Sequence, residues 1–290
     1  MPLVDLTHAI DLHIHSNPSL FNRSGSDLEM AQHAADNHLK AIMLKNHFES
    51  TVGRAFLADQ QIEGTRVFGG LVMNHFAGGL NPVAVEHAIR LGAKQIWMPT
   101  IDAMAHADVF GKVGGYGYQE SKTRVAKEGI RILNANGGLF EEAKAIVTLV
   151  MEADIILGTA HLCKKEIVAL TRFAKKQGFK KVLITHPYFD PPKLTVSDQV
   201  ELAEMGATIE LCGGNLYPIP GVAKLSDYLH TIAKVGTRSL VLSSDAGQPR
   251  KSLPAEVLRV FAQCLMEKGV SQKEIDQMTK DNPTRLLNLS

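Results

Sequence analysis

A repeated alternation of short apolar runs and longer amphipathic segments constrains the fold of this chain more than any other feature. Each run holds four to eight residues rich in Val, Ile and Leu, as is typical of strands in a parallel sheet, and the amphipathic segments predict covering helices. Eight runs occur, at residues 9–14, 41–44, 66–73, 95–98, 154–158, 181–185, 207–211 and 239–243. Because eight βα units close a parallel barrel, we predict a TIM-like α/β fold, a (β/α)8 barrel that spans residues 1–290 as one domain.

Capping signals support the predicted helices at both of their ends. Four helices are expected to begin after a capping residue or at a proline, namely at Ser26, Asn81-Pro82, Thr195 and Leu253-Pro254. Five are expected to end at a glycine in left-handed conformation, namely Gly92, Gly178, Gly206, Gly236 and Gly269. The regular spacing of these signals favours the repeated βα interpretation.

One segment interrupts the repeat, because residues 102–138 form an insertion after the fourth strand that is much longer than an ordinary βα loop. Its first part contains the glycine-rich sequence GKVGGYGYQ, and its second part, GIRILNANGGLF, predicts a small hairpin that turns at Asn136-Gly137. Two interpretations remain open, a lid over the mouth of the barrel and an insertion without ordered structure.

Charge and cysteine content narrow the classes of partner. The chain carries 31 basic and 30 acidic residues, without the basic excess that nucleic acids or acidic membranes attract, so we expect a small-molecule substrate. The first residues lack the features of a signal peptide and no apolar run is long enough to span a bilayer, which favours a cytoplasmic protein. Cys163, Cys212 and Cys264 predict packed thiols, and apolar helix faces allow a homo-oligomer.

Histidines gather where the predicted strands end, which is where a (β/α)8 barrel builds its active site. Six of the twelve histidines follow a strand, namely His13, His15, His47, His75, His161 and His186. Alternation along a strand points His13 and His15 to the same side, so their imidazoles can chelate one cation. The alternative is a pair of structural histidines.

Two charged residues also stand at strand ends. Asp245 follows the eighth strand, beside the first in a closed barrel, where it suits a metal ligand or a base next to a metal-bound water; a turn-forming aspartate is the alternative. Lys45 ends the second strand, where burial of an unpaired ammonium is costly. We expect Lys45 to face a substrate, a carboxylate or a CO2 molecule that forms a carbamate, with a plain surface lysine as the alternative.

These residues resemble the amidohydrolase superfamily of metal-dependent hydrolases. The resemblance is carried by His13-Ile-His15, His161, His186 and Asp245 in the expected chain order, and by the C-terminal sequence NPTRLLNL. More narrowly, the segments GGLNPVAVEHAIRLGAKQIWMPTIDA and GTAHL are similar to an uncharacterised branch of amidohydrolase-like cytosolic proteins.

The resemblance implies a distorted (β/α)8 barrel with a divalent metal, zinc first and manganese, iron or nickel as alternatives. Strand four ends in Trp97-Met98-Pro99-Thr100, without the lysine or glutamate that bridges two metals in binuclear members, which favours one main site. The implied ligands are His13, His15, His161 and Asp245, and His186 is either a further ligand or the group that polarises the substrate. Because the DxHxH run also suits the polymerase-and-histidinol-phosphatase family, His47 is a candidate ligand for a second metal.

Other polar residues near the strand ends are candidate substrate contacts. Asp102 and His106 can replace the missing strand-four ligand or bind substrate, and the alternative is a helix cap with a solvated histidine. Either Arg54 or Lys45 is expected to hold an anionic part of the substrate. His75 is expected to contact the substrate as well.

The predicted function is a metal-dependent hydrolase in which an activated water attacks a carbonyl-type bond, such as an amide or a lactone, of a small and anionic substrate. Asp245 would take the proton from the water, and His186 and Lys45 would assist. Three alternatives stay open. They are a phosphoesterase, which needs several metals and more cations than Lys45, Arg54 and Arg23 supply, a metal-dependent decarboxylase or hydratase, and a barrel that binds a metabolite without catalysis.

Overall fold

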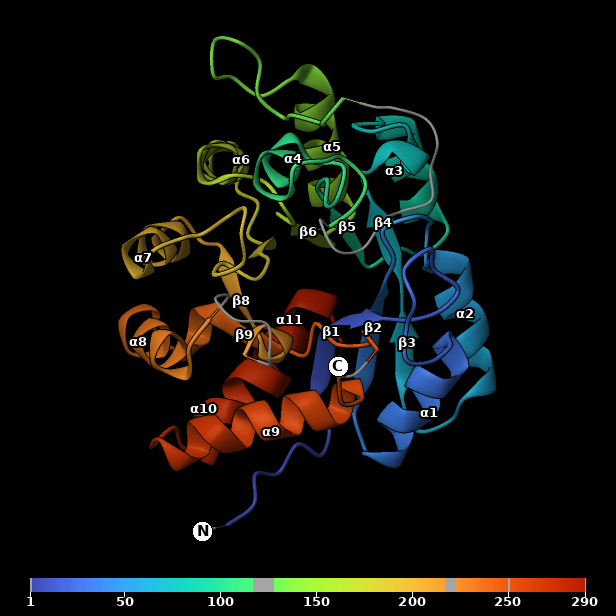
Figure 1. Cartoon of the computed structure of the whole chain (residues 1–290), viewed down its shortest axis with the longest axis vertical. Coiled ribbons are helices and arrows are strands. Elements are labelled where there is room, and N and C mark those ends of the chain that lie inside the picture. Colours follow the sequence, from blue (N-terminus) through green and yellow to red (C-terminus); the bar gives the residue numbers. More distant parts are fainter. Residues whose placement is uncertain (1, 117–127, 217–222, 250, 290) are drawn as a thin grey trace.

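Parallel strands form the centre of the molecule (Figure 1), nine of them within the residues that the structure describes. The computed structural model describes residues 2–116, 128–216, 223–249 and 251–289. The strands within this part of the chain are β1 Ile10–His15, β2 Ala41–Lys45, β3 Arg66–Phe68, β4 Gly70–Val72, β5 Gln95–Trp97, β6 Ile156–Gly158, β7 Val182–Ile184, β8 Thr208–Cys212 and β9 Leu240–Ser243. They pair in chain order as β1-β2-β3 and as β4-β5-β6-β7-β8-β9.

The two ends of this strand order meet between β9 and β1. The backbone N–H of Asp245, just after β9, donates to the carbonyl oxygen of His13 at 2.9 Å, and the N–H of His15 donates to Ala246 at 2.8 Å. Ile14 and Ala246 form a parallel bridge. The predicted (β/α)8 barrel is therefore confirmed.

The expected third strand, residues 66–73, is two strands that share one direction but have different neighbours. β3 pairs with β2 and β4 pairs with β5, and the break falls at Gly69. Thr51 enters the gap, because its hydroxyl donates to the carbonyl oxygen of Leu44 at 2.8 Å and accepts from the N–H of Gly70 at 2.9 Å. A Cβ at Gly69 would lie 2.4 Å from the carbonyl oxygen of Thr51, so only glycine fits this close approach.

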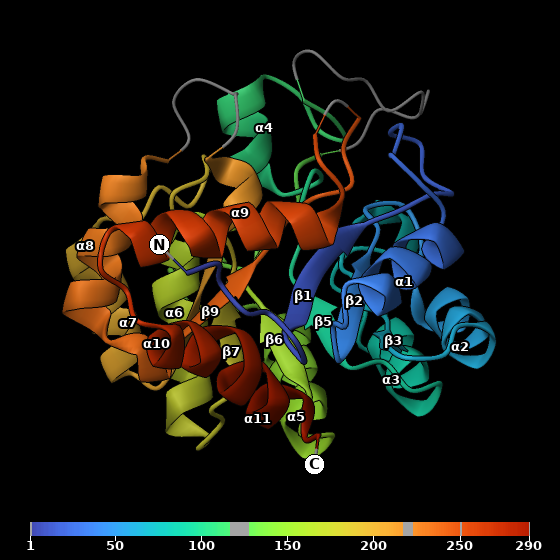
Figure 2. The same ribbon diagram turned by 90° about the horizontal axis from the view of Figure 1, so that it is seen from below.

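Helices follow the strands and cover the outside of the barrel (Figures 1 and 2). The helices in the described ranges are α1 Asp27–Asp36, α2 Val52–Gln61, α3 Pro82–Arg90, α4 Met104–Phe110, α5 Glu141–Glu152, α6 Lys164–Lys176, α7 Val196–Glu204, α8 Leu225–Val235, α9 Pro254–Glu267, α10 Gln272–Asp276 and α11 Asn282–Leu287. Single 3-10 turns lie at His75–Ala77, Gly213–Asn215 and Thr237–Ser239, and one π-helical turn lies at Gln277–Asp281.

The predicted capping signals are confirmed. Ser26 and Thr195 accept N–H groups at the start of α1 and α7, Asn81 does so for α3, and Pro254 opens α9. The five predicted terminal glycines have φ values between +78° and +102°, although the ψ of 146° at Gly236 lies outside the αL region that was predicted there. The last helices, α9 and α11, pack against β1, so the C-terminal part of the chain supports the strand that carries His13 and His15.

The insertion at 102–138 has ordered structure in the parts that the structure describes. It begins with α4, and its hairpin is confirmed because Leu133 bridges Leu139 in antiparallel fashion and Gly137 occupies the turn with φ +78°. Residues 117–127, which hold the end of the glycine-rich sequence, lie outside the described residues. Among the described helices, none has the length and apolar character needed to cross a bilayer.

Candidate metal centre

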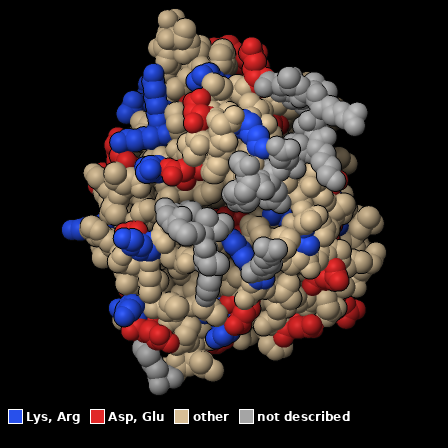
Figure 3. All heavy atoms as spheres, in the orientation of Figure 1, with Lys and Arg blue, Asp and Glu red and all other residues tan. Residues whose placement is uncertain are grey.

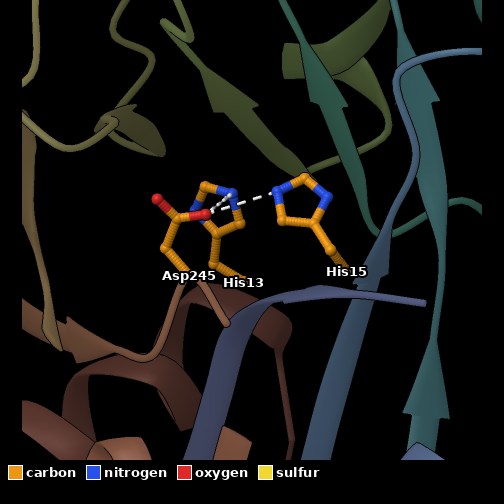
Figure 4. A group of neighbouring side chains, drawn as sticks. All are labelled: His13, His15 and Asp245. Carbon is orange, nitrogen blue, oxygen red and sulfur yellow. Dashed lines mark ion pairs between the residues drawn. The ribbon is translucent and has the colours of Figure 1, made fainter. Parts of the chain in front are cut away.

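His13 and His15 lie at the carboxyl end of β1, with both rings directed at one carboxylate (Figure 4). The Nε2 atoms of both histidines lie 3.3 Å from Oδ1 of Asp245. The register of β1 against β2 shifts between Asp11 and Ile14, so a bulge precedes the point where the two rings converge. His13 and His15 are 1% and 3% exposed, so the predicted pair is buried in the barrel.

Asp245 is held in place by the backbone that closes the barrel. Besides the bond to His13, the preceding Ser244 donates its N–H to Asp11 at 3.0 Å. Asp245 adopts φ +48°, a left-handed conformation that costs a non-glycine residue about 1–2 kcal/mol. The chain then passes so close to β1 that a Cβ at Gly247 would lie 1.8 Å from the carbonyl oxygen of His15. The closing contact between β9 and β1 therefore fixes the carboxylate against the two imidazoles.

The spacing of His13, His15 and Asp245 fits a divalent metal. Ligand atoms about 2.1 Å from a tetrahedral ion stand about 3.4 Å apart, close to the 3.3 Å observed here. The three residues form one of two groups in the described part of the chain whose ligand atoms lie close enough together for one ion. Two imidazoles and one carboxylate are among the donor sets that hold catalytic zinc.

His15 and Asp245 are in the protonation states that a metal ligand requires. It lowers the pKa of His15 well below the usual value, so the imidazole is neutral. Burial alone would raise the pKa of Asp245, but the neighbouring His13 and His15 hold it well below its usual value. The site therefore presents an ionised carboxylate beside a neutral imidazole.

Glu210 on β8 lies behind His13. Its Oε2 is 3.3 Å from Nδ1 of His13, and the side chain is fully buried. A carboxylate that accepts the N–H of one ring nitrogen leaves the other nitrogen free as a ligand, so Glu210 directs Nε2 of His13 toward Asp245. The Sγ atom of Cys212 lies 4.0 Å from the same Nδ1, and His13, Glu210 and Cys212 form the second group of close ligand atoms.

Five buried histidines form a closed ring around the mouth of the barrel. Neighbouring rings have centroids 5.0 to 6.1 Å apart, in the order His13, His15, His47, His161, His186 and back to His13. Burial lowers the pKa of each of the last three, that of His186 to about 3. The structure thus brings together all five histidines predicted as ligands.

Lys45 belongs to the same buried site. It is 1% exposed, so the alternative of a surface lysine is wrong. Its Nζ lies 3.1 Å from Nε2 of His13 and 5.5 Å from the ring centre of Trp97. Burial lowers the pKa of Lys45, although Asp245 and Glu210 oppose the effect.

The outer histidines have partners of their own. Nδ1 of His47 lies 2.9 Å from the hydroxyl of Thr100, and Nδ1 of His161 lies 2.9 Å from Nδ1 of His106. Nε2 of His106 in turn donates to the carbonyl oxygen of Gly115 at 3.0 Å, which ties the insertion to the ring of histidines. His106 is fully buried, so the alternative of a solvated histidine is wrong.

Aromatic side chains flank the histidines and limit access of water. Phe189, after β7, packs against His161 and His186, with ring centroids 5.2 and 5.0 Å away. Phe21, after β1, lies 5.9 Å from His47 and 5.8 Å from Tyr116 of the insertion. The described end of the insertion therefore packs against the mouth of the barrel.

Asp102 and His75 contact each other at the edge of this region. The carboxylate of Asp102 accepts the backbone N–H of His75 at 2.8 Å, and Nε2 of His75 lies 2.8 Å from the carbonyl oxygen of Glu128. Ala103, not Asp102, precedes the first residue of α4, and α4 has no side-chain cap, so the capping interpretation of Asp102 is wrong. Neither Asp102 nor His75 belongs to a group of close ligand atoms in the described ranges.

Two comparisons by sequence gave different results. A family model described as a family of unknown function (DUF6282) matches residues 8–210. The chain belongs to that family. The match includes every predicted site residue except Asp245. No curated protein matches the chain by sequence.

Solved structures of several hydrolases share the fold of this DUF6282 member. An amidohydrolase from Pseudomonas aeruginosa is 13% identical with a TM-score of 0.65, and the match covers 97% of this chain and 96% of that one. An organophosphorus hydrolase from Deinococcus radiodurans is 12% identical (TM-score 0.61, 98% and 93% covered). A probable 2-pyrone-4,6-dicarboxylic acid hydrolase from Acinetobacter baumannii is 16% identical (TM-score 0.63, 97% and 100% covered). These likenesses support the predicted α/β barrel fold.

In this family member, Arg54 is paired within the protein, and other basic residues lie near Asp245. The guanidinium of Arg54 is bound by Asp27 and Glu49, in salt bridges within the protein. Its contact with substrate stays a prediction. Arg23 and Lys251 instead interact electrostatically with Asp245, and burial lowers the pKa of Arg23 to about 10. Figure 3 shows basic and acidic side chains interspersed over the face of the molecule seen in Figure 1.

Glu210 is the main site residue that the sequence prediction missed. Its signal was present, because an acidic residue interrupts the otherwise apolar strand at residues 207–211, and an unpaired charge is costly to bury. Thr100 and Phe189 gave no comparable signal, since a threonine and a phenylalanine after a strand are ordinary loop residues.

Proposed function

We propose that this protein is a metal-dependent hydrolase that acts on a carbonyl-type bond, such as an amide or a lactone, of a small anionic substrate. The observation that carries the proposal is the convergence of His13, His15 and Asp245, with atoms 3.3 Å apart in a buried site at the mouth of the barrel. The reaction class is further supported by the hydrolases that share the fold, among them the organophosphorus hydrolase and the pyrone dicarboxylic acid hydrolase.

His13, His15 and Asp245 would hold the metal, zinc first, with His161 across the ring as the fourth candidate ligand. When bound, such a metal lowers the pKa of a water ligand to about 7 and polarises a carbonyl oxygen. Glu210 keeps Nε2 of His13 directed into the site by accepting the proton of Nδ1. The five histidines stay neutral or are paired with carboxylates, which suits a cation site.

Asp245 is the group best placed to accept a proton from the attacking water, because its carboxylate is ionised and borders the two imidazoles. His186 is neutral, as burial lowers its pKa to about 3, and it can donate a hydrogen bond to the carbonyl oxygen of the substrate. Nδ1 of His186 is buried without a partner among the described residues, so the ring has a nitrogen available for a ligand. Phe189 beside it keeps bulk water away from the reacting atoms.

The substrate is proposed to be anionic because three basic residues gather near Asp245. Lys45, Arg23 and Lys251 each interact electrostatically with Asp245. In the described part of the chain, no carboxylate forms a salt bridge with Arg23, and its guanidinium lies 5.8 Å from the ring centre of Phe21. A carboxylate of the substrate would give this guanidinium a salt-bridge partner.

Elemental analysis of protein purified without chelators tests the proposal, together with an anomalous-scattering map of crystals. We expect about one metal per chain, at His13, His15 and Asp245. Two or three metals per chain, with one at His47, would instead favour a phosphoesterase. Among the described residues, no group of three close ligand atoms includes His47.

A product assay then identifies the reaction. We expect turnover of anionic lactones or amides that depends on the bound metal. Release of CO2 or addition of water to a double bond in β-keto or aromatic acids would favour a decarboxylase or hydratase on the same barrel. Protein that retains no metal would favour a barrel that binds a metabolite without catalysis.

A further inference from the structure

His161 and His106 form a buried hydrogen-bonded pair whose proton positions follow from a third atom. Nε2 of His106 lies 3.0 Å from the carbonyl oxygen of Gly115, and a carbonyl oxygen can only accept. Nε2 of His106 must therefore carry a proton. The next atom in the chain of contacts is Nδ1 of His106, which lies 2.9 Å from Nδ1 of His161.

The ring of His106 is neutral, so its second nitrogen accepts. The side chain is fully buried between Phe110 and Tyr116, with ring centroids 4.4 and 5.0 Å away, and no carboxylate forms a salt bridge with it in the described ranges. A neutral imidazole with its proton on Nε2 has a lone pair on Nδ1. Nδ1 of His161 must then be the donor in the 2.9 Å contact.

We propose that His106 is a positioning residue that fixes the tautomer of His161, with its proton on Nδ1 and the lone pair of Nε2 directed into the ring of histidines. This inference rests on the proposed metal site. It assigns His106 a role behind a ligand, where the sequence suggested contact with substrate. Because Gly115 belongs to the insertion, the insertion helps to determine the tautomer of the candidate ligand His161.

Nitrogen-15 NMR of metal-free protein labelled at histidine tests the proposed tautomer of His161. We expect a protonated Nδ1 and an unprotonated Nε2 for His161, assigned by the signals that are lost in His161→Asn. In His106→Leu, which removes the acceptor, we expect the proton of His161 to move to Nε2 in most molecules. A wild-type His161 with its proton on Nε2 would overturn the proposal.

Zinc affinity, measured by competition with a chelator, tests whether His106 positions His161 for metal binding. We expect His106→Leu to weaken zinc binding about 10- to 100-fold, the usual effect of an outer-shell partner. His106→Gln is the matched control, because its amide oxygen can accept from Nδ1 of His161, and its affinity should stay near that of the wild type. Unchanged affinity in the Leu variant would overturn the ligand-positioning role. If the wild type binds no zinc at all, the metal site of the proposed function fails, while the tautomer measurement still reports on the pair.

Thr100 carries an independent inference about His47. The hydroxyl of Thr100 is fully buried and accepts from the side-chain amide of Asn74 at 2.7 Å. Its own proton needs an acceptor, and Nδ1 of His47, 2.9 Å away, is the acceptor that the described residues offer. We infer that His47 carries its proton on Nε2 and donates a hydrogen bond to the substrate, so that it is not a metal ligand.

The same NMR spectrum tests this second inference. We expect a protonated Nε2 on His47 in the wild type, opposite to His161. Thr100→Val, which removes the hydroxyl at equal size, should leave zinc affinity near the wild-type value and raise KM for the substrate, because the donor is no longer fixed. A proton on Nδ1 of His47, or loss of a second metal in Thr100→Val, would overturn it.

Discussion

Asp245 is joined to His13 twice, by its backbone N–H to the carbonyl oxygen at 2.9 Å and by its carboxylate, 3.3 Å from Nε2 of the same histidine. The first contact closes the barrel and the second forms the candidate metal site. Closure and site assembly are therefore one event, and a substitution can remove the second contact while it keeps the first.

Asp245→Asn removes the carboxylate contact with His13 and keeps the backbone contact. The amide keeps the backbone bonds and the size of the side chain but removes the negative charge, so we expect zinc affinity to fall by more than about 100-fold, beyond the effect of an outer-shell partner, and turnover to be lost. The circular dichroism spectrum should not change. Glu201→Gln, at an exposed carboxylate on α7, is the control and should behave as the wild type. His13→Ala should match Asp245→Asn, and retained turnover in either variant would refute the assigned site.

Glu210→Gln tests whether the carboxylate behind His13 orients a ligand or binds a metal of its own. An orienting role predicts zinc affinity about 10- to 100-fold weaker, with one site per chain. Cys212→Ala is the matched variant, since Cys212 lies beside the same nitrogen but would not affect orientation by Glu210. We expect it to keep the wild-type metal content. Loss of metal in Cys212→Ala would show that His13, Glu210 and Cys212 form a real site.

The elements of the fold and the centre of the site could be predicted from sequence because their signals are local. Strand composition and capping residues predicted the βα units, and the spacing of His13 and His15 predicted a shared side of β1. The break at Gly69 could not be predicted, because it depends on a hydroxyl that enters from Thr51. Nor does the sequence reveal which of two arginines is already paired, since the contacts of Arg54 with Asp27 arise only in the folded chain.

Arg23→Gln tests the proposed anion contact. The loss of a hydrogen bond between charged groups, about 1.5–3 kcal/mol, predicts kcat/KM about 10- to 100-fold lower for an anionic substrate, mostly through KM. Arg54→Gln is the matched control. Its guanidinium is bound by Asp27 and Glu49, so we expect this variant to lose stability and to keep KM. If only Arg54→Gln raises KM, the substrate anion binds at Arg54, as the sequence suggested.

Stability of the metal-free protein should fall as the pH falls from about 7 to 5. Burial lowers the folded-state pKa of five histidines, His15, His47, His106, His161 and His186. Below their unfolded pKa of about 6.5, the unfolded chain therefore binds more protons than the folded one, which favours unfolding. Asp11 acts in the opposite direction, because burial raises its pKa to about 7 and the folded chain gains a proton there as the pH falls. Because five histidines destabilise the folded state at lower pH and only Asp11 stabilises it, the protein should lose stability as the pH falls.

Urea denaturation at several pH values measures this slope. Each fully unprotonated histidine contributes about 1.4 kcal/mol per pH unit below its unfolded pKa. His186→Gln should therefore reduce the slope by about that amount, whereas His230→Gln, at an exposed histidine on α8, should leave it unchanged. Asp245 does not contribute in this range, because a lowered carboxylate pKa reduces stability only below its unfolded value of about 4. A stability that is flat or rises toward pH 5 would mean that the ring of histidines binds protons in the folded state, and a metal would then have to displace them.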